Sequence, residues 1–212
     1  MNKGGKSYLV FTSWGYRIWG LLVIPALLLA VTYFIFADIA AISSHGLYTG
    51  GSLVLFYEIF SDYWLFGGIC SRQPEYLKTS LQGMPVLRGA LIGDLIRRFL
   101  YVMVFAAVCY GKSHKPEALC VGLMIYLIAV GTLNITRYLP GAIQLMMVAC
   151  LATAVYEVYG VVTKGMHGGT AELILLIAAG IGVSIVTVGH VLCRQKRSYY
   201  EKKSEKESEK GN

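Results

Sequence analysis

The sequence predicts an all-α protein that crosses a membrane six times, and three observations carry this prediction. The 212 residues are 56% hydrophobic and only 15% charged, whereas soluble domains carry about 25% charged residues. Apolar runs recur along the chain at roughly 20 residues, the length that a helix needs to cross a bilayer core about 30 Å thick. The 19 basic residues gather at the ends of these runs, where they set membrane orientation and give no indication of nucleic-acid binding.

Each expected span is an apolar run between polar residues. The spans are expected near 18–37, 47–69, 93–110, 118–136, 138–156 and 173–193. The third span must begin before Arg97 and Arg98, because too few residues separate Arg98 from Lys112 to cross the membrane otherwise. We expect both arginines to reach the membrane interface with their long side chains. Gly46 and Gly50 form a small-xxx-small spacing that permits close helix approach.

The basic residues also predict the orientation. With both termini in the cytoplasm, every lysine and arginine except Lys112, Lys115 and Lys164 lies inside. Residues 3–17 mix basic and aromatic side chains and predict an interfacial helix before the first span.

Two regions complete the organisation of the chain. The glycine-rich residues 157–169 form either a plain outer loop or a short re-entrant element. We therefore expect one membrane domain, 1–193, and a charged cytoplasmic tail, 194–212, that extends the last helix and then frays.

Two acids fall inside the second expected span. Glu58 and Asp62 are four residues apart and share one helix face near the middle of the membrane. Charges at that depth are costly and face a bundle interior or a wet cavity. One interpretation is a site that contacts a substrate or a proton. The other is a protonated or hydrogen-bonded pair that orders the bundle through Tyr57 and Tyr63.

The polar segment 71–98 separates the second and third spans, with five basic and two acidic side chains. Residues 73–75, Gln-Pro-Glu, are a helix-start signal. Leu77 and Leu81 then share one face of a short amphipathic helix expected along the inner interface. Residues 83–85, Gly-Met-Pro, end this helix, and leucines recur at helical spacing as the chain returns to the membrane.

This layout resembles the type-2 ABC export permease family. The loop after the second span of that family commonly reads E-x-L-x-x-(S/T)-x-x-x-P-x-x-R-x-x-L-x-G followed by a polar residue, often a lysine. Residues at or near these places are Glu75, Leu77, Ser80, Pro85, Arg88, Leu91, Gly93 and Asp94. Pro25 inside the first span, the basic and aromatic N-terminal segment and the six spans resemble the family as well.

The resemblance implies one membrane half of an ATP-driven exporter in the bacterial plasma membrane. Two such halves, identical or different, pair, and each docks a separate ATPase subunit that binds ATP and magnesium, so no catalytic residue, cofactor or metal is expected on this chain. Segment 71–92 becomes the coupling segment. Its docking surface would be Gln73, Pro74, Glu75, Tyr76, Leu77, Lys78, Thr79 and Ser80. The mostly apolar spans suit an amphipathic or hydrophobic cargo such as a peptide, lipid or drug.

Two alternatives stay open. A small membrane peptidase or lipid-modifying enzyme would need a nucleophile, base or metal set in segment 71–98, where there is no histidine and Cys70 adjoins the segment alone. A proton-coupled secondary transporter would use Glu58 and Asp62 as carriers, although the inverted repeats usual in such proteins are not evident. Purification with a co-expressed ATPase discriminates among the three functions.

Overall fold

The computed structural model describes residues 16–42, 45–72, 83–136 and 169–210, and the regular structure within these ranges is helical. Residues 16–42 form one continuous run of four pieces: η1 (Tyr16–Val23), α2 (Ile24–Val31), η2 (Thr32–Phe36) and α3 (Ala37–Ile42). The other helices are α4 (His45–Arg72), α6 (Gly83–Ser113), α7 (Glu117–Thr136) and α9 (Thr170–Lys210). The expected all-α fold is confirmed for these residues.

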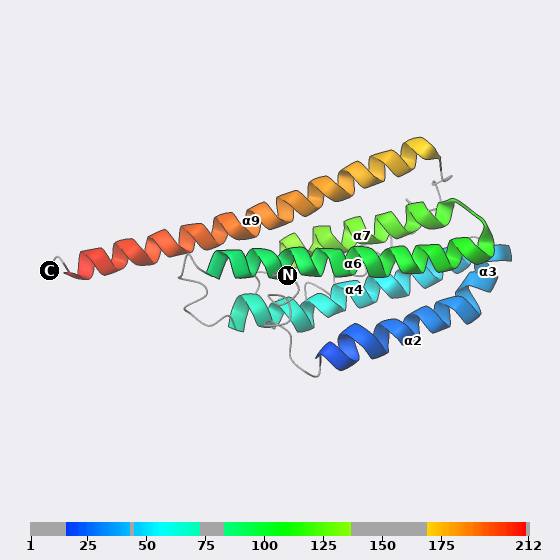
Figure 1. The fold of residues 1–212 in the computed structure, drawn as a ribbon, viewed down its shortest axis with the longest axis horizontal. Coiled ribbons are helices and arrows are strands. Elements are labelled where there is room, and N and C mark those ends of the chain that lie inside the picture. The colour runs from blue at the N-terminus through cyan, green and yellow to red at the C-terminus, as the bar shows by residue number, and fades with distance from the viewer. Residues whose placement is uncertain (1–15, 43–44, 73–82, 137–168, 211–212) are drawn as a thin grey trace.

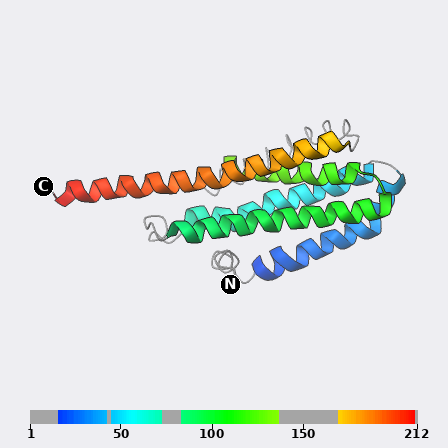
Figure 2. The same cartoon turned by 45° about the horizontal axis from the view of Figure 1, so that its top comes forward.

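The helices lie side by side; the first run, α4, α6 and α7 alternate in direction, and α9 runs in the same direction as α7 (Figure 1). The C-terminal end of α4 and the N-terminal end of α6 lie toward one end of the bundle, and the turn from α6 to α7 lies at the other. We call these the Gly83 end and the Lys112 end. The extension of α9 projects past the other helices at the Gly83 end, as Figure 2 also shows.

The first helical run departs from α-helical geometry around a proline. Pro25 lies in the first turn of α2, directly after the π-helical piece η1. In a π-helix each N–H bonds the carbonyl five residues earlier, and proline has no N–H to donate. The carbonyl of Gly20 therefore lacks that donor, and the hydroxyl of Tyr57 on α4 donates to it instead. This contact fixes the first run against α4.

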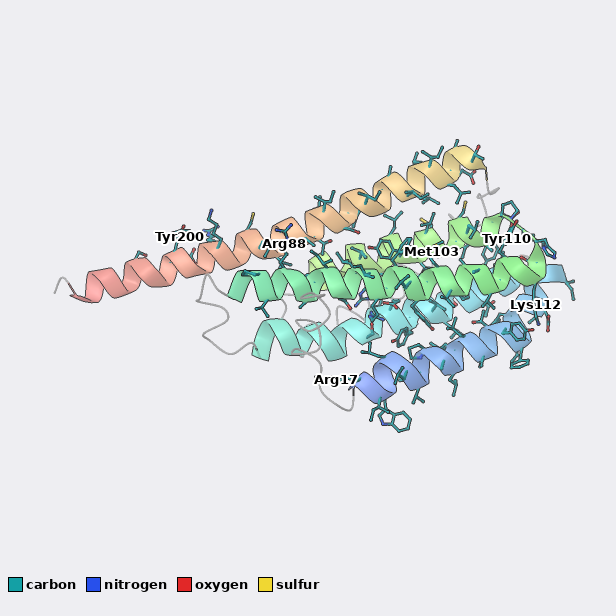
Figure 3. The ribbon with its side chains drawn as sticks, in the orientation of Figure 1. Arg17, Arg88, Met103, Tyr110, Lys112 and Tyr200 are labelled. Carbon is teal, nitrogen blue, oxygen red and sulfur yellow. The ribbon has the colours of Figure 1, made fainter. Side chains whose placement is uncertain are left out.

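The Lys112 end is held by lysine side chains that reach back to the first run. The Nζ of Lys112 bonds the Asp38 Oδ1 at 2.6 Å and the Tyr33 carbonyl at 2.8 Å. The Nζ of Lys115 donates to the carbonyl of Ala40 at 3.0 Å. Figure 3 shows Lys112 at this end of the bundle.

Close backbone contact joins α3 and α4 at the same end. A Cβ placed on Gly46 would lie 2.6 Å from the carbonyl oxygen of Phe36 and would also meet the backbone N of Ala40. Such distances are shorter than any side chain tolerates, so only glycine permits this approach. A Cβ on Gly50 would lie 3.1 Å from Phe36 Cβ. The small-xxx-small prediction is confirmed.

The main hydrophobic core lies where α3, α4, α6 and α7 meet, and residues of α9 pack against it. Val54 of α4, Val102 and Phe105 of α6, and Ile125 of α7 are each 1% exposed or less. By contrast, many large apolar side chains of the first run and of α9 point outward, including Leu22 at 66% and Ile185 at 67% exposure. Soluble monomers rarely expose apolar surfaces of that extent.

Two helices, Arg17–Ala40 and Thr170–Cys193, are long and apolar enough to cross a membrane, and Glu117–Thr132 is a shorter apolar helix. The expected runs 18–37, 47–69, 118–136 and 173–193 each lie within a helix. The third helix begins ten residues before the expected 93, at Gly83, because the leucine-bearing approach to the span is helical too.

The remaining predictions on the fold have separate outcomes. The tail is a helix extension, as expected, and it stays helical to Lys210. The expected fifth span 138–156, the interfacial residues 3–15 and the glycine-rich residues 157–168 lie outside the described residues.

Candidate functional site

The residues singled out from the sequence divide into two groups. The docking residues 73–80 lie outside the described residues, and so does the whole stretch between Arg72 of α4 and Gly83 of α6. The two acids of the expected second span, Glu58 and Asp62, lie on α4, where the side chain of Glu58 is fully buried. Asp62 is one turn further along α4, and its side chain is outside the described set.

Glu58 is the acceptor of a buried ion-pair cluster between α4 and α6. Arg97 donates to it with two nitrogens, Nη1 to Oε1 at 3.2 Å and Nη2 to Oε2 at 3.0 Å. Arg98 Nη1 donates to the same Oε2 at 2.8 Å and to the backbone carbonyl of Glu58 at 2.8 Å. Charge-assisted and bidentate contacts of this kind are the strongest hydrogen bonds of side chains.

Asp94 completes the cluster from within α6. It lies three and four residues before the two arginines, the spacings that put side chains on one helix face. Its Oδ1 accepts from Arg97 Nε at 3.2 Å and its Oδ2 from Arg98 Nε at 2.8 Å. Each guanidinium is thereby held from both sides, by Asp94 at Nε and by Glu58 at its terminal nitrogens. We call Glu58, Asp94, Arg97 and Arg98 the charge cluster.

The charge cluster is almost closed to its surroundings. The side chains of Glu58, Asp94 and Arg98 are at most 1% exposed, and only that of Arg97 reaches 16%. Two acids and two bases cancel in formal charge, and buried charges persist only when they are paired and hydrogen-bonded. The expectation that both arginines extend to the membrane interface is therefore wrong for Arg98, because a carboxylate at its own depth binds it.

Two tyrosines join α4 and α6 next to the charge cluster along the chain: Tyr57 directly precedes Glu58, and Tyr101 follows Arg98 by three residues. The rings of Tyr57 and Tyr101 meet edge to face with centroids 5.2 Å apart. Tyr57 bonds the Gly20 carbonyl, so the network continues from α6 through α4 to the first run. The buried hydroxyl of Tyr101 has no hydrogen-bond partner among the described residues. Tyr57 thus joins α4 to the first run, while the predicted role of a Glu58 and Asp62 pair in ordering the bundle stays a prediction, because the side chains of Asp62 and Tyr63 lie outside the described set.

The carboxylates of the charge cluster offer little further chemistry, because their oxygens already accept hydrogen bonds. All four carboxylate oxygens of Glu58 and Asp94 accept hydrogen bonds from the arginines. Within the described ranges no group of three His, Cys, Asp or Glu side chains is placed to hold a metal ion. The arrangement is suited to locking α4 and α6 together at one register.

Sequence reasoning found Glu58 but missed its three partners. The sequence signal that identifies these partners is the distance of each residue from the end of its helix. At 1.5 Å per residue, Glu58 lies about 20 Å along α4 from His45, and Arg98 lies about 22 Å along α6 from Ser113. Because His45 and Ser113 are at the same end of the bundle, an acid and a base at matching distance predict a pair. The spacing of Asp94 to the arginines adds the third and fourth members.

A second polar contact joins α7 to α9. The hydroxyls of Tyr126 and Ser184 are 2.8 Å apart, and Ser184 also donates to the Gly180 carbonyl one turn earlier at 2.7 Å. Phe99 of α6 packs edge to face on the Tyr126 ring. Unlike the charge cluster, this contact carries no charged group.

Comparison of the chain with protein-family models, with curated proteins and with solved structures gives no significant match in any of the three.

Proposed function

We propose that the chain is the membrane subunit of an ATP-driven exporter of the type-2 ABC class, which moves an amphipathic or hydrophobic cargo outward. Two copies, or this chain and a related one, would pair in a bacterial plasma membrane. A separate ATPase subunit would bind ATP and magnesium and dock on residues 73–80. The proposal rests on the resemblance of the segment between the second and third spans to that family.

The observation that favours a transmission role is the position of the charge cluster. Residues 73–80 connect the end of α4 to the start of α6, and the cluster ties those two helices to each other about halfway along their length. A displacement of the connecting segment therefore acts on one locked pair of helices rather than on two that slide independently. Switching transitions of this kind move packed helices as units.

The membrane orientation in the proposal follows from the helix directions together with the charges. Lys112 lies at one end of the bundle and Arg88 toward the other (Figure 3); Lys115 bonds Ala40 at the Lys112 end, and Arg72 is the last residue of α4 at the Gly83 end. Under the positive-inside rule the Gly83 end is cytoplasmic, and the α9 extension is too. The exposed apolar faces of the first run and of α9 support contact with lipid along both.

Burial of Glu58 also bears on the proton-coupled alternative. A proton carrier must release its partners in each cycle, whereas both oxygens of Glu58 are bound by two arginines that Asp94 holds in place. This favours a fixed structural role for Glu58, and so it favours the permease over the carrier.

The decisive experiment is purification of the chain with the ATPase encoded beside it. We expect a stable complex in which the membrane subunit changes the ATPase rate, and the Glu75→Ala/Tyr76→Ala double variant should lose this stimulation while it inserts normally. Tyr200→Ala/Glu201→Ala is a matched control, because it removes the same two residue types from the exposed α9 extension. Normal transport by the docking variant, or the absence of any ATPase partner, would overturn the proposal.

A further inference from the structure

A large apolar cavity lies between α6, α7 and α9, away from the charge cluster. It has a volume of about 670 Å³, within the range of roughly 300–1,000 Å³ that ligand pockets occupy. Its walls are mostly aliphatic and aromatic side chains, among them Ile92, Leu95 and Phe99 of α6 and Ile181 of α9. A cavity of this composition favours hydrocarbon as its occupant.

The cavity wall contains few polar side chains, and these differ in whether they have a hydrogen-bond partner. Tyr126 and Ser184 line the cavity but bond each other. Arg88 is the charged residue among the lining residues, is exposed, and has no ion-pair or hydrogen-bond partner in the part of the chain that the structure describes. Figure 3 shows Arg88 near the start of α6, toward the Gly83 end. The cavity thus combines an apolar interior with one uncompensated positive charge at its end.

The depth of this charge matches the level of lipid headgroups. A helix crosses the hydrocarbon core of about 30 Å in about 20 residues, so a core that begins near Gly111 ends near Leu91 on α6. Arg88 then lies just beyond the core on the cytoplasmic side. From Arg88 to Leu100 the cavity wall extends about 18 Å along α6, close to the thickness of one leaflet with its headgroup.

We propose that this cavity binds an anionic phospholipid of the inner leaflet, with an acyl chain between α6 and α9 and the phosphate at Arg88. Basic pockets between membrane helices on the cytoplasmic side recognise anionic headgroups in this way. The assignment rests on the membrane orientation in the proposed function. It does not depend on the ATPase, because binding requires only the folded chain.

The test measures lipid binding to the purified, delipidated chain in a neutral detergent by native mass spectrometry. Titration with phosphatidylglycerol should give one tightly retained molecule, and phosphatidylcholine should bind more weakly. Arg88→Gln should weaken phosphatidylglycerol binding by about fivefold or more, the effect of one basic residue near an anionic headgroup, and leave phosphatidylcholine unchanged. Arg197→Gln, which removes an exposed basic residue from the α9 extension, should change binding by less than about twofold.

A second variant tests the apolar part of the cavity. Ile181 is 58% exposed and lines the cavity, so Ile181→Trp fills space without disturbing the core. We expect it to lower retention of both lipids. Unchanged retention would show that the lipid does not lie in this cavity, which overturns the proposal. Equal binding of both lipids to the wild type, or competition by free glycerol 3-phosphate, overturns it as well.

Failure of this assignment is distinguishable from failure of the proposed function. Lipid retention is measured without ATP or a partner, and the ATPase complex is measured with Arg88 intact. A chain that binds an ATPase but shows no preference for phosphatidylglycerol loses only the lipid site.

Discussion

The contact between α4 and α6 is made by charged side chains, whereas the contact of α9 with α6 and α7 is made mostly by apolar ones. The first holds two acids and two arginines that are almost fully buried and joined by hydrogen bonds of 2.8–3.2 Å. The second surrounds an apolar cavity of about 670 Å³, and beside it a hydrogen bond between two neutral hydroxyls, those of Tyr126 and Ser184, joins α7 to α9.

In the membrane of the proposed function, these two kinds of contact should hold their helices with different strength. Apolar side chains gain little from packing on each other rather than on lipid, because both surroundings are equally apolar. Paired charges cannot leave each other without a large cost inside the membrane. The charged contact between α4 and α6 is therefore expected to cost more to separate, residue for residue, than the apolar contacts of α9. The predictions below test this contrast, beginning with the largest expected effect.

Removal of one acid from the charge cluster should be the most damaging change. Glu58→Leu leaves Arg97 and Arg98 with Asp94 alone, so one buried positive charge is uncompensated. Breaking a buried ion pair from one side costs about 3–5 kcal/mol. We expect a loss of that order in the free energy of unfolding, measured by detergent denaturation in mixed micelles.

The matched control restores the charge balance. Glu58→Leu combined with Arg97→Leu leaves Asp94 and Arg98 as a neutral pair at 2.8 Å. Much of the lost free energy should return, since replacing both partners with apolar groups is often nearly neutral. A single variant as stable as the wild type would show that the charges do not lock α4 to α6.

Close packing at the Lys112 end should be the next most sensitive feature. Gly46→Ala places a Cβ against the backbone of the first run, 2.6 Å from the Phe36 carbonyl oxygen. Backbone cannot move aside as a flexible side chain does, so we expect a cost of about 1–3 kcal/mol. Gly182→Ala on α9 is the control, because no atom lies within 4 Å of its added methyl. Equal stability of the two variants would contradict the close approach.

The sequence predicts where the helices lie along the chain better than it predicts which helices contact each other. Hydrophobic runs of about 20 residues predict where a span lies along the chain, and the described helices contain the expected runs 18–37, 47–69, 93–110, 118–136 and 173–193. Hydropathy reports only the apolar part of α6, from residue 93, whereas the helix already begins at Gly83 in the polar approach to the span, which the sequence predicts to be helical. Leucine spacing at Leu87, Leu91 and Leu95 already carried that information, and all three are buried.

The charge cluster shows the limit more sharply. Glu58 was singled out because an acid in a span is costly, whereas Arg98 was assigned to the interface because a long side chain can reach water. Hydropathy indicates where along a span each residue lies, but not which neighbouring helix its side chain faces. The spacing of Asp94 to the two arginines already predicts their contact within α6, but the binding of the same arginines to Glu58 becomes visible only when α4 lies beside α6.

The bond between Tyr57 and the first helical run should have an intermediate effect. Tyr57→Phe leaves the Gly20 carbonyl without the donor that replaces the missing N–H of Pro25. We expect a loss of about 1 kcal/mol in the free energy of unfolding. In a Pro25→Ala background the carbonyl regains a backbone donor, so Tyr57→Phe should cost less there. Equal costs in the two backgrounds would contradict this account of the proline.

The smallest effect is expected at the contact between α7 and α9. Hydrogen bonds between membrane helices average about 0.6 kcal/mol in double-mutant cycles, because the separated groups find other partners. Ser184 already has one, the Gly180 carbonyl at 2.7 Å. A cycle of Tyr126→Phe and Ser184→Ala should therefore give a coupling free energy near that value, well below the coupling between Glu58 and Arg98. A coupling as large as that of the ion pair would remove the contrast, because α9 would then be fixed to the bundle as firmly as α4 is to α6.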